Sequence, residues 1–189
     1  MKILTIPHPV LREESQPVAD PADKNFQRWL KEMETTLLTT ENPKGVGLAG
    51  PQVDKLYRVF LTALPEKETE KPQVIAYINP KIVKHSDQHT FGPDPENPKL
   101  EGCLSMPTIY GPVPRWEWVE VEYQTLKDGE VVEKKDRFDG FHGRVVQHEI
   151  DHLSGILFTD YALEFDLPVY QEEAKELVEI ADRGILELY

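Results

Sequence analysis

The segment His148-Glu149-Ile150-Asp151-His152 has the residue types and the spacing of a hydrolytic metal site. In a helix, residues four positions apart lie one turn from each other on the same face, so both imidazoles can bind one metal ion. Glu149 lies between them on the helical wheel and can reach a water beside the ion without being a ligand. The segment therefore predicts a metal centre with its own general base.

Two histidines leave the ligand set of such a centre incomplete, because catalytic sites of the zinc type commonly use three protein ligands and one open position. The first candidate is Cys103, the single cysteine, in Glu101-Gly102-Cys103-Leu104-Ser105. A lone cysteine is usually a small buried apolar residue, but a thiolate beside two imidazoles would complete the set. The other candidates are glutamates of a later segment, as in one class of metallopeptidases: Glu172, Glu173 and Glu176.

Residues 45–52 form a glycine-rich loop that reads Gly-Val-Gly-Leu-Ala-Gly-Pro-Gln. The loop lacks the Gly-Lys-Ser/Thr ending of a phosphate loop and the spacing of a dinucleotide fingerprint. Its small residues would let an extended chain lie close to the backbone. Gln52 supplies a neutral side-chain donor of the kind that stabilises an oxyanion.

Three helices are expected to position these residues. The first covers 20–39, with Asp20 as the cap and Pro21 in the first turn. The second covers 140–157 and carries the two histidines, with Phe141 and Val145 on the histidine face. Its opposite stripe would face the core and consists of Val146, Ile150, Leu153 and Leu157. The third covers 167–181 and would end before Gly184.

Strands are expected between these helices at 56–64, 74–82, 116–126 and 130–138. Residues 65–72 read as an exposed hairpin loop, and residues 86–99 as a loop. Asp128-Gly129 is a hairpin turn signal, and a change of phase at 118/119 suggests a bulge. The order of elements favours an α+β fold, in which antiparallel sheets pack around a central metal-binding helix with an N-terminal and a C-terminal helix.

The length of 189 residues suits one domain spanning 1–189. The net charge of −13 and the lack of a basic stripe argue against DNA as a partner. No apolar run approaches the ~20 residues of a membrane span, so we expect no membrane contact. One cysteine permits no internal disulfide, and we therefore expect a cytoplasmic protein.

Together the three chemical segments resemble the peptide deformylase family. That family carries a Gly-x-Gly-Leu-Ala-Ala-x-Gln loop, a Glu-Gly-Cys-Leu-Ser segment and a His-Glu-x-x-Asp-His-Leu helix in this order. Here the three motifs lie at 45–52, 101–105 and 148–153. The opening Ile3-Leu4-Thr5-Ile6-Pro7 and the segment Val113-Pro114-Arg115 are similar to the family as well, so the resemblance covers roughly residues 1–162.

The resemblance implies a hydrolase that removes the N-formyl group from the initiator methionine of nascent peptides and releases formate. It assigns the metal to Cys103, His148 and His152, with Fe2+ preferred and Ni2+, Co2+ or Zn2+ as substitutes. It makes Glu149 the general base and acid. The formyl oxygen would be held by Gln52 and by the backbone N–H of Leu104. The substrate-binding residues would be Val46, Gly47, Gly102, Phe141 and Val145.

The chain departs from the family pattern in three places. Gly50 replaces an alanine, which would loosen the glycine-rich loop, and the stretch 86–99 is longer than in compact members. The last helix is acidic, which argues against docking on ribosomal RNA and leaves at most a transient ribosome contact. Three alternatives stay open: a metallopeptidase with a glutamate ligand, a deformylase-like enzyme for another acyl substrate, and a metal-binding protein without enzymatic activity.

Overall fold

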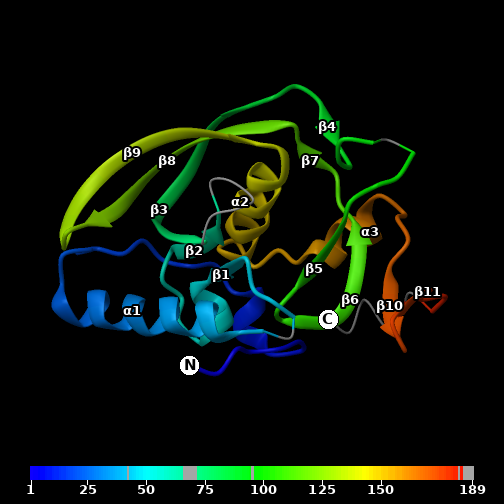
Figure 1. Cartoon of the computed structure of the whole chain (residues 1–189), viewed down its shortest axis with the longest axis horizontal. Coiled ribbons are helices and arrows are strands. Elements are labelled where there is room, and N and C mark those ends of the chain that lie inside the picture. Colours follow the sequence, from blue (N-terminus) through cyan, green and yellow to red (C-terminus); the bar gives the residue numbers. More distant parts are fainter. Residues whose placement is uncertain (42, 66–71, 95, 183, 185–189) are drawn as a thin grey trace.

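The computed structural model describes residues 1–41, 43–65, 72–94, 96–182 and 184. Within this part of the chain, a five-stranded and a four-stranded antiparallel sheet lie on either side of helix α2 (Gly140–His152). Figure 1 shows α2 at the centre of the molecule, with α1 (Lys24–Thr39) below it. The α+β fold class with a central helix is confirmed. No helix in the described ranges is long and apolar enough to cross a membrane.

Helix α1 begins four residues later than expected. Its cap is Asp23, whose carboxylate accepts hydrogen bonds from the backbone N–H groups of Asn25 and Phe26, both at 2.9 Å. Asp20 was the wrong choice, because its carboxylate accepts from Ala22 N–H and holds a turn before the helix. The buried face of α1 packs against β1 and β2 through Phe26, Leu30, Met33 and Leu37.

The five-stranded sheet has the order β1-β2-β3-β8-β9. Its strands are β1 (Gly47–Ala49), β2 (Val59–Leu64), β3 (Gln73–His85), β8 (Trp118–Lys127) and β9 (Glu130–Asp139). The predicted turn is confirmed, because Asp128 and Gly129 both have positive φ (54° and 84°) and join β8 to β9. Most of the predicted loop 65–72 lies outside the described residues.

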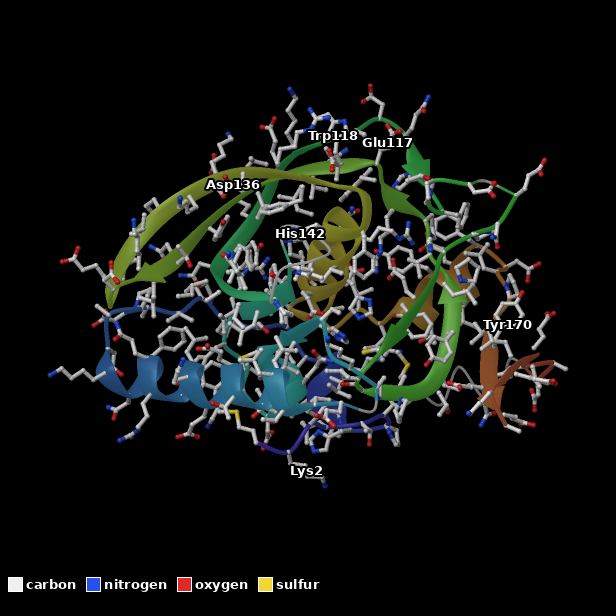
Figure 2. The ribbon with its side chains drawn as sticks, in the orientation of Figure 1. Lys2, Glu117, Trp118, Asp136, His142 and Tyr170 are labelled. Atoms are coloured by element: carbon white, nitrogen blue, oxygen red, sulfur yellow. The ribbon has the colours of Figure 1, made fainter. Side chains whose placement is uncertain are left out.

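One face of this sheet packs on α2. On the other face, β1 and β2 pack against α1, and the β8–β9 end is polar. The core cluster shared with α2 includes Phe60, Tyr77, Val121, Val146 and Leu153. On the outer face of that end the Arg137 guanidinium lies 3.9 Å from the centre of the Trp118 ring, and Figure 2 shows Trp118 on this side. The predicted strand 116–126 is interrupted at Glu117, next to the expected bulge, and its first part is the short β7 (Arg115–Trp116).

The four-stranded sheet has the order β11-β10-β6-β5. Its strands are β5 (Leu100–Cys103), β6 (Met106–Pro112), β10 (Tyr170–Glu173) and β11 (Glu176–Glu179). The predicted helix over 167–181 is therefore wrong. The segment is rich in helix-forming residues, but pairing of β10 with the edge of β6 outweighs that propensity. Ala174 and Lys175 have positive φ (50° and 71°), which closes the hairpin.

Helix α2 is shorter than predicted. It stops at His152, the chain turns at Gly155 with φ 69°, and α3 (Phe158–Glu164) begins after Leu157. The predicted core stripe is largely confirmed, because Val146, Leu153 and Leu157 are buried. The remaining elements are the 3-10 turns η1 (Pro9–Arg12) and η2 (Gly50–Val53) and the short strand β4 (His89–Thr90). Strand β4 lies inside the predicted loop 86–99 and pairs with β7.

Candidate metal and catalytic site

Cys103, His148 and His152 come together at the junction of β5 and α2. One potential ligand atom from each residue lies within 4.8 Å of the other two. Cys103 Sγ is 3.2 Å from His152 Nε2, and the centres of the two imidazole rings are 4.9 Å apart. One thiol and two imidazoles suit Fe2+, Ni2+, Co2+ or Zn2+, whereas Mg2+ and Ca2+ prefer oxygen ligands. The donor set therefore fits a single transition-metal ion.

Glu149 lies beside this cluster with its side chain buried, only 4% exposed. Its Oε2 atom accepts no hydrogen bond from any residue in the described ranges. Burial raises the pKa of the carboxyl to about 7, although the charges of His148 and Arg115 work in the opposite direction. A carboxyl group that lines a cavity with an unpartnered oxygen has the properties of a general base.

The glycine-rich loop approaches Glu149 closely at Gly47. A Cβ atom at Gly47 would lie 2.2 Å from Glu149 Oε1, so every other residue type would collide with the carboxylate. Gly50 has a similar packing role, because a Cβ there would lie 2.6 Å from the carbonyl oxygen of Tyr57. Both glycines permit close packing of backbone, and Gly50 belongs to a tight turn rather than a loosened loop.

Gln52 points its amide nitrogen at the cluster. Its Oε1 accepts from Ala49 N–H at 2.8 Å, while Nε2 donates to Ser105 Oγ at 3.1 Å and to Cys103 Sγ at 3.5 Å. Ser105 N–H also donates to Cys103 Sγ. Both donors are directed at the sulfur, and the thiolate is the form of cysteine that binds metal. Leu104 follows Cys103 in the turn between β5 and β6 and lines the same cavity.

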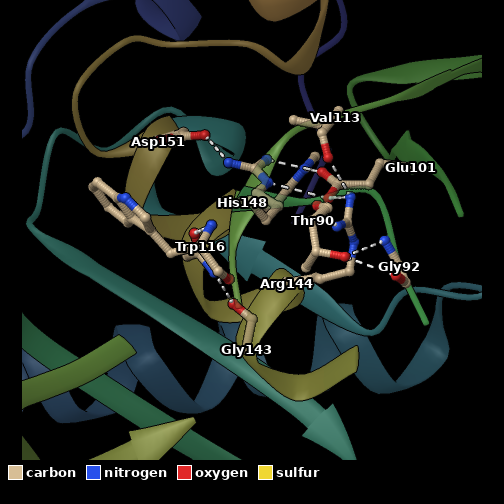
Figure 3. Close-up of polar contacts among 11 residues, drawn as sticks. Thr90, Gly92, Glu101, Val113, Trp116, Gly143, Arg144, His148 and Asp151 are labelled. Atoms are coloured by element: carbon tan, nitrogen blue, oxygen red, sulfur yellow. Dashed lines mark hydrogen bonds and ion pairs between the residues drawn. The ribbon is translucent and has the colours of Figure 1, made fainter. Parts of the chain in front are cut away.

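Glu101 holds His148 in place through a network that the sequence analysis missed (Figure 3). Glu101 Oε2 lies 3.2 Å from His148 Nδ1, which leaves Nε2 of that ring for the cluster. Arg115 donates to both carboxylate oxygens of Glu101, at 2.8 and 3.1 Å, and Arg144 donates to one of them at 2.8 Å. Burial alone would raise the pKa of Glu101, but Arg115 and His148 outweigh it and hold this pKa well below its usual range.

The two arginines of the network connect the site to distant segments. Arg115, 2% exposed, also pairs with Asp151 one residue before His152. Arg144 donates to the backbone carbonyls of Val113 at 2.6 Å and Thr90 at 2.9 Å (Figure 3). Both arginines left a signal in the sequence. Arg144 precedes His148 by four residues and so shares its helix face, and Arg115 lies in the family-like segment Val113-Pro114-Arg115.

The two histidines have different pKa values in the absence of metal. Burial and then the neighbouring charge of His148 lower the pKa of His152 well below its usual value. Burial also disfavours the charged form of His148, but hydrogen bonding to Cys103 and Glu101 raises its pKa well above the usual value. Of the two imidazoles, His148 is therefore the one that binds a proton more readily, and metal binding would have to displace that proton.

The cavity in front of the cluster has a volume of about 320 Å³. All five predicted substrate-binding residues line it: Val46, Gly47, Gly102, Phe141 and Val145. Val145 is buried, while Phe141 is 63% exposed. Strands β1 and β5 are each the end strand of a sheet, and both border this cavity.

Gln147 lies next to His148 in the sequence but bonds elsewhere. It forms a pair of hydrogen bonds with the backbone of Trp116, at 2.9 and 3.0 Å, and so fixes α2 to β7. Glu172 is exposed on β10, where it accepts from Tyr110 OH at 3.4 Å. In the described part of the chain, none of the glutamates on the last hairpin joins the group of potential ligands. A third ligand from that hairpin is therefore not supported.

Comparison with known proteins gives consistent matches. The sequence model of a family described as polypeptide deformylase matches residues 1–166. A peptide deformylase of Roseiflexus castenholzii is 41% identical over 146 residues, which cover 71% of this chain and 74% of that protein. Peptide deformylase 2 of a Nostoc species is 36% identical over 184 residues and 94% of each chain. The crystal structure of a probable peptide deformylase from Synechococcus phage S-SSM7 has a TM-score of 0.72 at 37% identity, covering 85% of this chain and 99% of the other.

Proposed function

The chain belongs to the peptide deformylase family and removes the N-formyl group from newly synthesised peptides, and from this premise we propose that Cys103, His148 and His152 form its catalytic metal site. The observation that carries the proposal is the approach of the Cys103 sulfur from β5 to the two imidazoles of α2, beside an unpartnered Glu149 oxygen. A metallopeptidase with a glutamate ligand lacks this support, because among the described residues Cys103, and no glutamate of the last hairpin, groups with the two histidines.

We propose Fe2+ as the bound ion, with Ni2+, Co2+ and Zn2+ as substitutes. The donor set of one thiolate and two imidazoles supports this choice over hard, oxygen-binding ions. When bound, such an ion supplies Lewis acidity, which polarises a carbonyl and lowers the pKa of a nearby water. Glu101 would support the ion indirectly, because it fixes the orientation of the His148 ring.

Glu149 is proposed to carry the proton during hydrolysis. Its carboxylate takes a proton from the attacking water and later donates it to the methionine nitrogen, as the bond from that nitrogen to the formyl carbon breaks. The unpartnered Oε2 atom and a pKa raised to about 7 by burial support both roles near neutral pH. Gln52 Nε2 and the backbone N–H of Leu104 are proposed to donate to the formyl oxygen as it gains negative charge.

The substrate is proposed to bind as an added strand between β1 and β5. The backbone carbonyl of Val46 accepts a hydrogen bond from Ala63 N–H and so points toward β2. In an antiparallel strand, the backbone N–H and C=O of successive residues point alternately to the two sides. Those of Gly47 therefore point away from β2, toward the cavity. Gly102 supplies the corresponding backbone on β5. The methionine side chain would lie against Val145 and Phe141.

The remaining proposals concern the context of the enzyme. We propose one catalytic domain over 1–189, because the β10–β11 hairpin beyond the matched segment is paired to β6. The cytoplasm is proposed as the compartment, because nascent formyl-methionyl peptides are made there and the thiol of Cys103 must stay reduced. Contact with the ribosome would be transient, because the acidic hairpin repels RNA phosphates.

The experiment that tests the proposed function combines two measurements on one sample. Formate release from a formyl-methionyl peptide is measured by a coupled assay, and bound metal is measured by mass spectrometry of the same protein. We expect one ion per chain and formate release that disappears when the ion is removed. Cleavage of internal peptide bonds without release of formate would instead favour a metallopeptidase.

A further inference from the structure

Most charged side chains that line the cavity are already engaged. Glu101 and Arg144 belong to the buried ion-pair network, and the catalytic cluster accounts for two more. The two that remain are Lys44 and Lys99. Both are exposed, and neither forms an ion pair with any residue that the structure describes.

Lys44 and Lys99 come from the two walls between which the substrate is proposed to lie. Lys44 precedes Gly47, which abuts Glu149, and Lys99 immediately precedes β5, which ends at Cys103. An extended chain rises by about 3.3 Å per residue, so the four steps from Cys103 back to Lys99 span about 13 Å. A substrate with its formyl group at the cluster would span the same distance with its first three or four residues in extended conformation.

We infer that Lys44 and Lys99 make this active site favour formyl peptides that carry carboxylate side chains at about the third and fourth residues. The inference rests on the proposed function, because it assumes that the formyl group lies at the cluster. The remaining negative charge of the protein would repel such peptides, but its influence is screened beyond about 8 Å at physiological salt. The charges next to the bound chain therefore decide the preference.

Two acidic residues lie near this rim, and neither lines the cavity. Glu41 is opposite Lys44 in an isolated β-bridge, but no ion pair joins them in the described structure. Glu172 accepts from Tyr110 OH, and Tyr110 lines the cavity. Glu172 itself is on β10, two strands from β5 and about 10 Å away in the direction of strand pairing. It does not line the cavity. Cationic peptides would therefore meet two lysines at the cavity before they could reach this carboxylate.

The test compares three formyl peptides that differ only in charge. They are fMet-Ala-Glu-Glu, fMet-Ala-Ser-Ser and fMet-Ala-Lys-Lys, each with an amidated C-terminus, and kcat and KM are measured from formate release. We expect KM for the Glu peptide to be about five- to tenfold lower than for the Lys peptide at low salt, with similar kcat, because exposed ion pairs are weak individually. Added salt should bring the ratio of KM between the Lys and Glu peptides toward one.

Substitution of the lysines assigns the effect to this rim. The double variant Lys44→Met/Lys99→Met should reduce the ratio of kcat/KM between the Glu and Lys peptides to about one. Lys134→Met is the matched control, because Lys134 is exposed on β9 away from the cavity, and it should keep the ratio. Two results overturn this inference and leave the proposed function standing. One is a kcat/KM ratio between the Glu and Lys peptides near one in the unchanged protein, and the other is the same ratio in the double variant as in the unchanged protein. Failure to release formate from the Ser peptide overturns the proposed function as well.

Discussion

Arg115 is the most deeply buried cation beside the site, and replacing it by methionine should destabilise the protein strongly. The side chain is 2% exposed and neutralises two carboxylates, Glu101 and Asp151. Methionine has a similar length and can fill much of the same space, so the main change is the loss of charge and of hydrogen-bond donors. Arg144 would still pair with Glu101, whereas Asp151 would lose the ion pair that Arg115 provides.

The size of the effect follows from this burial. Removing one partner of a buried ion pair costs about 3–5 kcal/mol, because the remaining charge is left without compensation. For a chain of this size that corresponds to a fall in Tm of roughly 6–20 °C. The exposed pair of Lys135 with Glu122, 3.1 Å apart and about half exposed, is the matched control. Lys135→Met should cost less than about 1 kcal/mol.

The assay is denaturant unfolding of both variants, with and without bound metal. The loss for Arg115→Met should persist in the metal-free protein, because the ion pairs do not depend on the metal. The metal-loaded variant should in addition release its ion faster, because Glu101 orients His148. Equal losses of less than about 1 kcal/mol for Arg115→Met and Lys135→Met would refute the reasoning, because burial would then have made no difference.

Three further substitutions separate the roles within the cluster. Glu149→Ala should keep one metal ion per chain and lose about 10²- to 10⁴-fold in kcat, and full activity would contradict its role as base. Gln52→Leu should lower kcat by about 10²-fold with unchanged metal content; a rise in KM alone would show that Gln52 binds ground state and transition state equally. Cys103→Ala should purify with little metal and release little formate, and a full equivalent of tightly bound ion would contradict its role as a ligand. Metal content is read by mass spectrometry and activity by formate release.

The chemical residues were predictable because their signals are local. The spacing of His148 and His152 places them on one face of any helix, and Gly47 marks a close backbone approach. The ion-pair network was not predictable in the same way. The residues that contact Glu101 lie 14 to 47 positions further along the chain. A helical period connects Arg144 with His148, but no periodicity connects either of them with Glu101 or Arg115.

The errors in the fold have physical causes as well. In Asp20-Pro21-Ala22-Asp23 either aspartate can cap a helix, and the local sequence does not decide between them. The segment 167–181 has good helix formers, but its partner is the edge of β6, about 60 residues earlier. Competition between local propensity and distant pairing is settled only in the folded chain.

The placement of β1 and β5 as facing end strands has a consequence for the range of proteins that the enzyme can serve. A peptide between them would join the two sheets into one continuous ladder, held by main-chain hydrogen bonds. Such bonds are the same for almost every residue, so recognition beyond the methionine is nearly blind to sequence. Proline is the exception, because it has no N–H to donate. In this proposed binding mode one enzyme would serve nascent chains of very different sequence, and the proposed charge preference at the rim would only modulate its efficiency from one chain to the next.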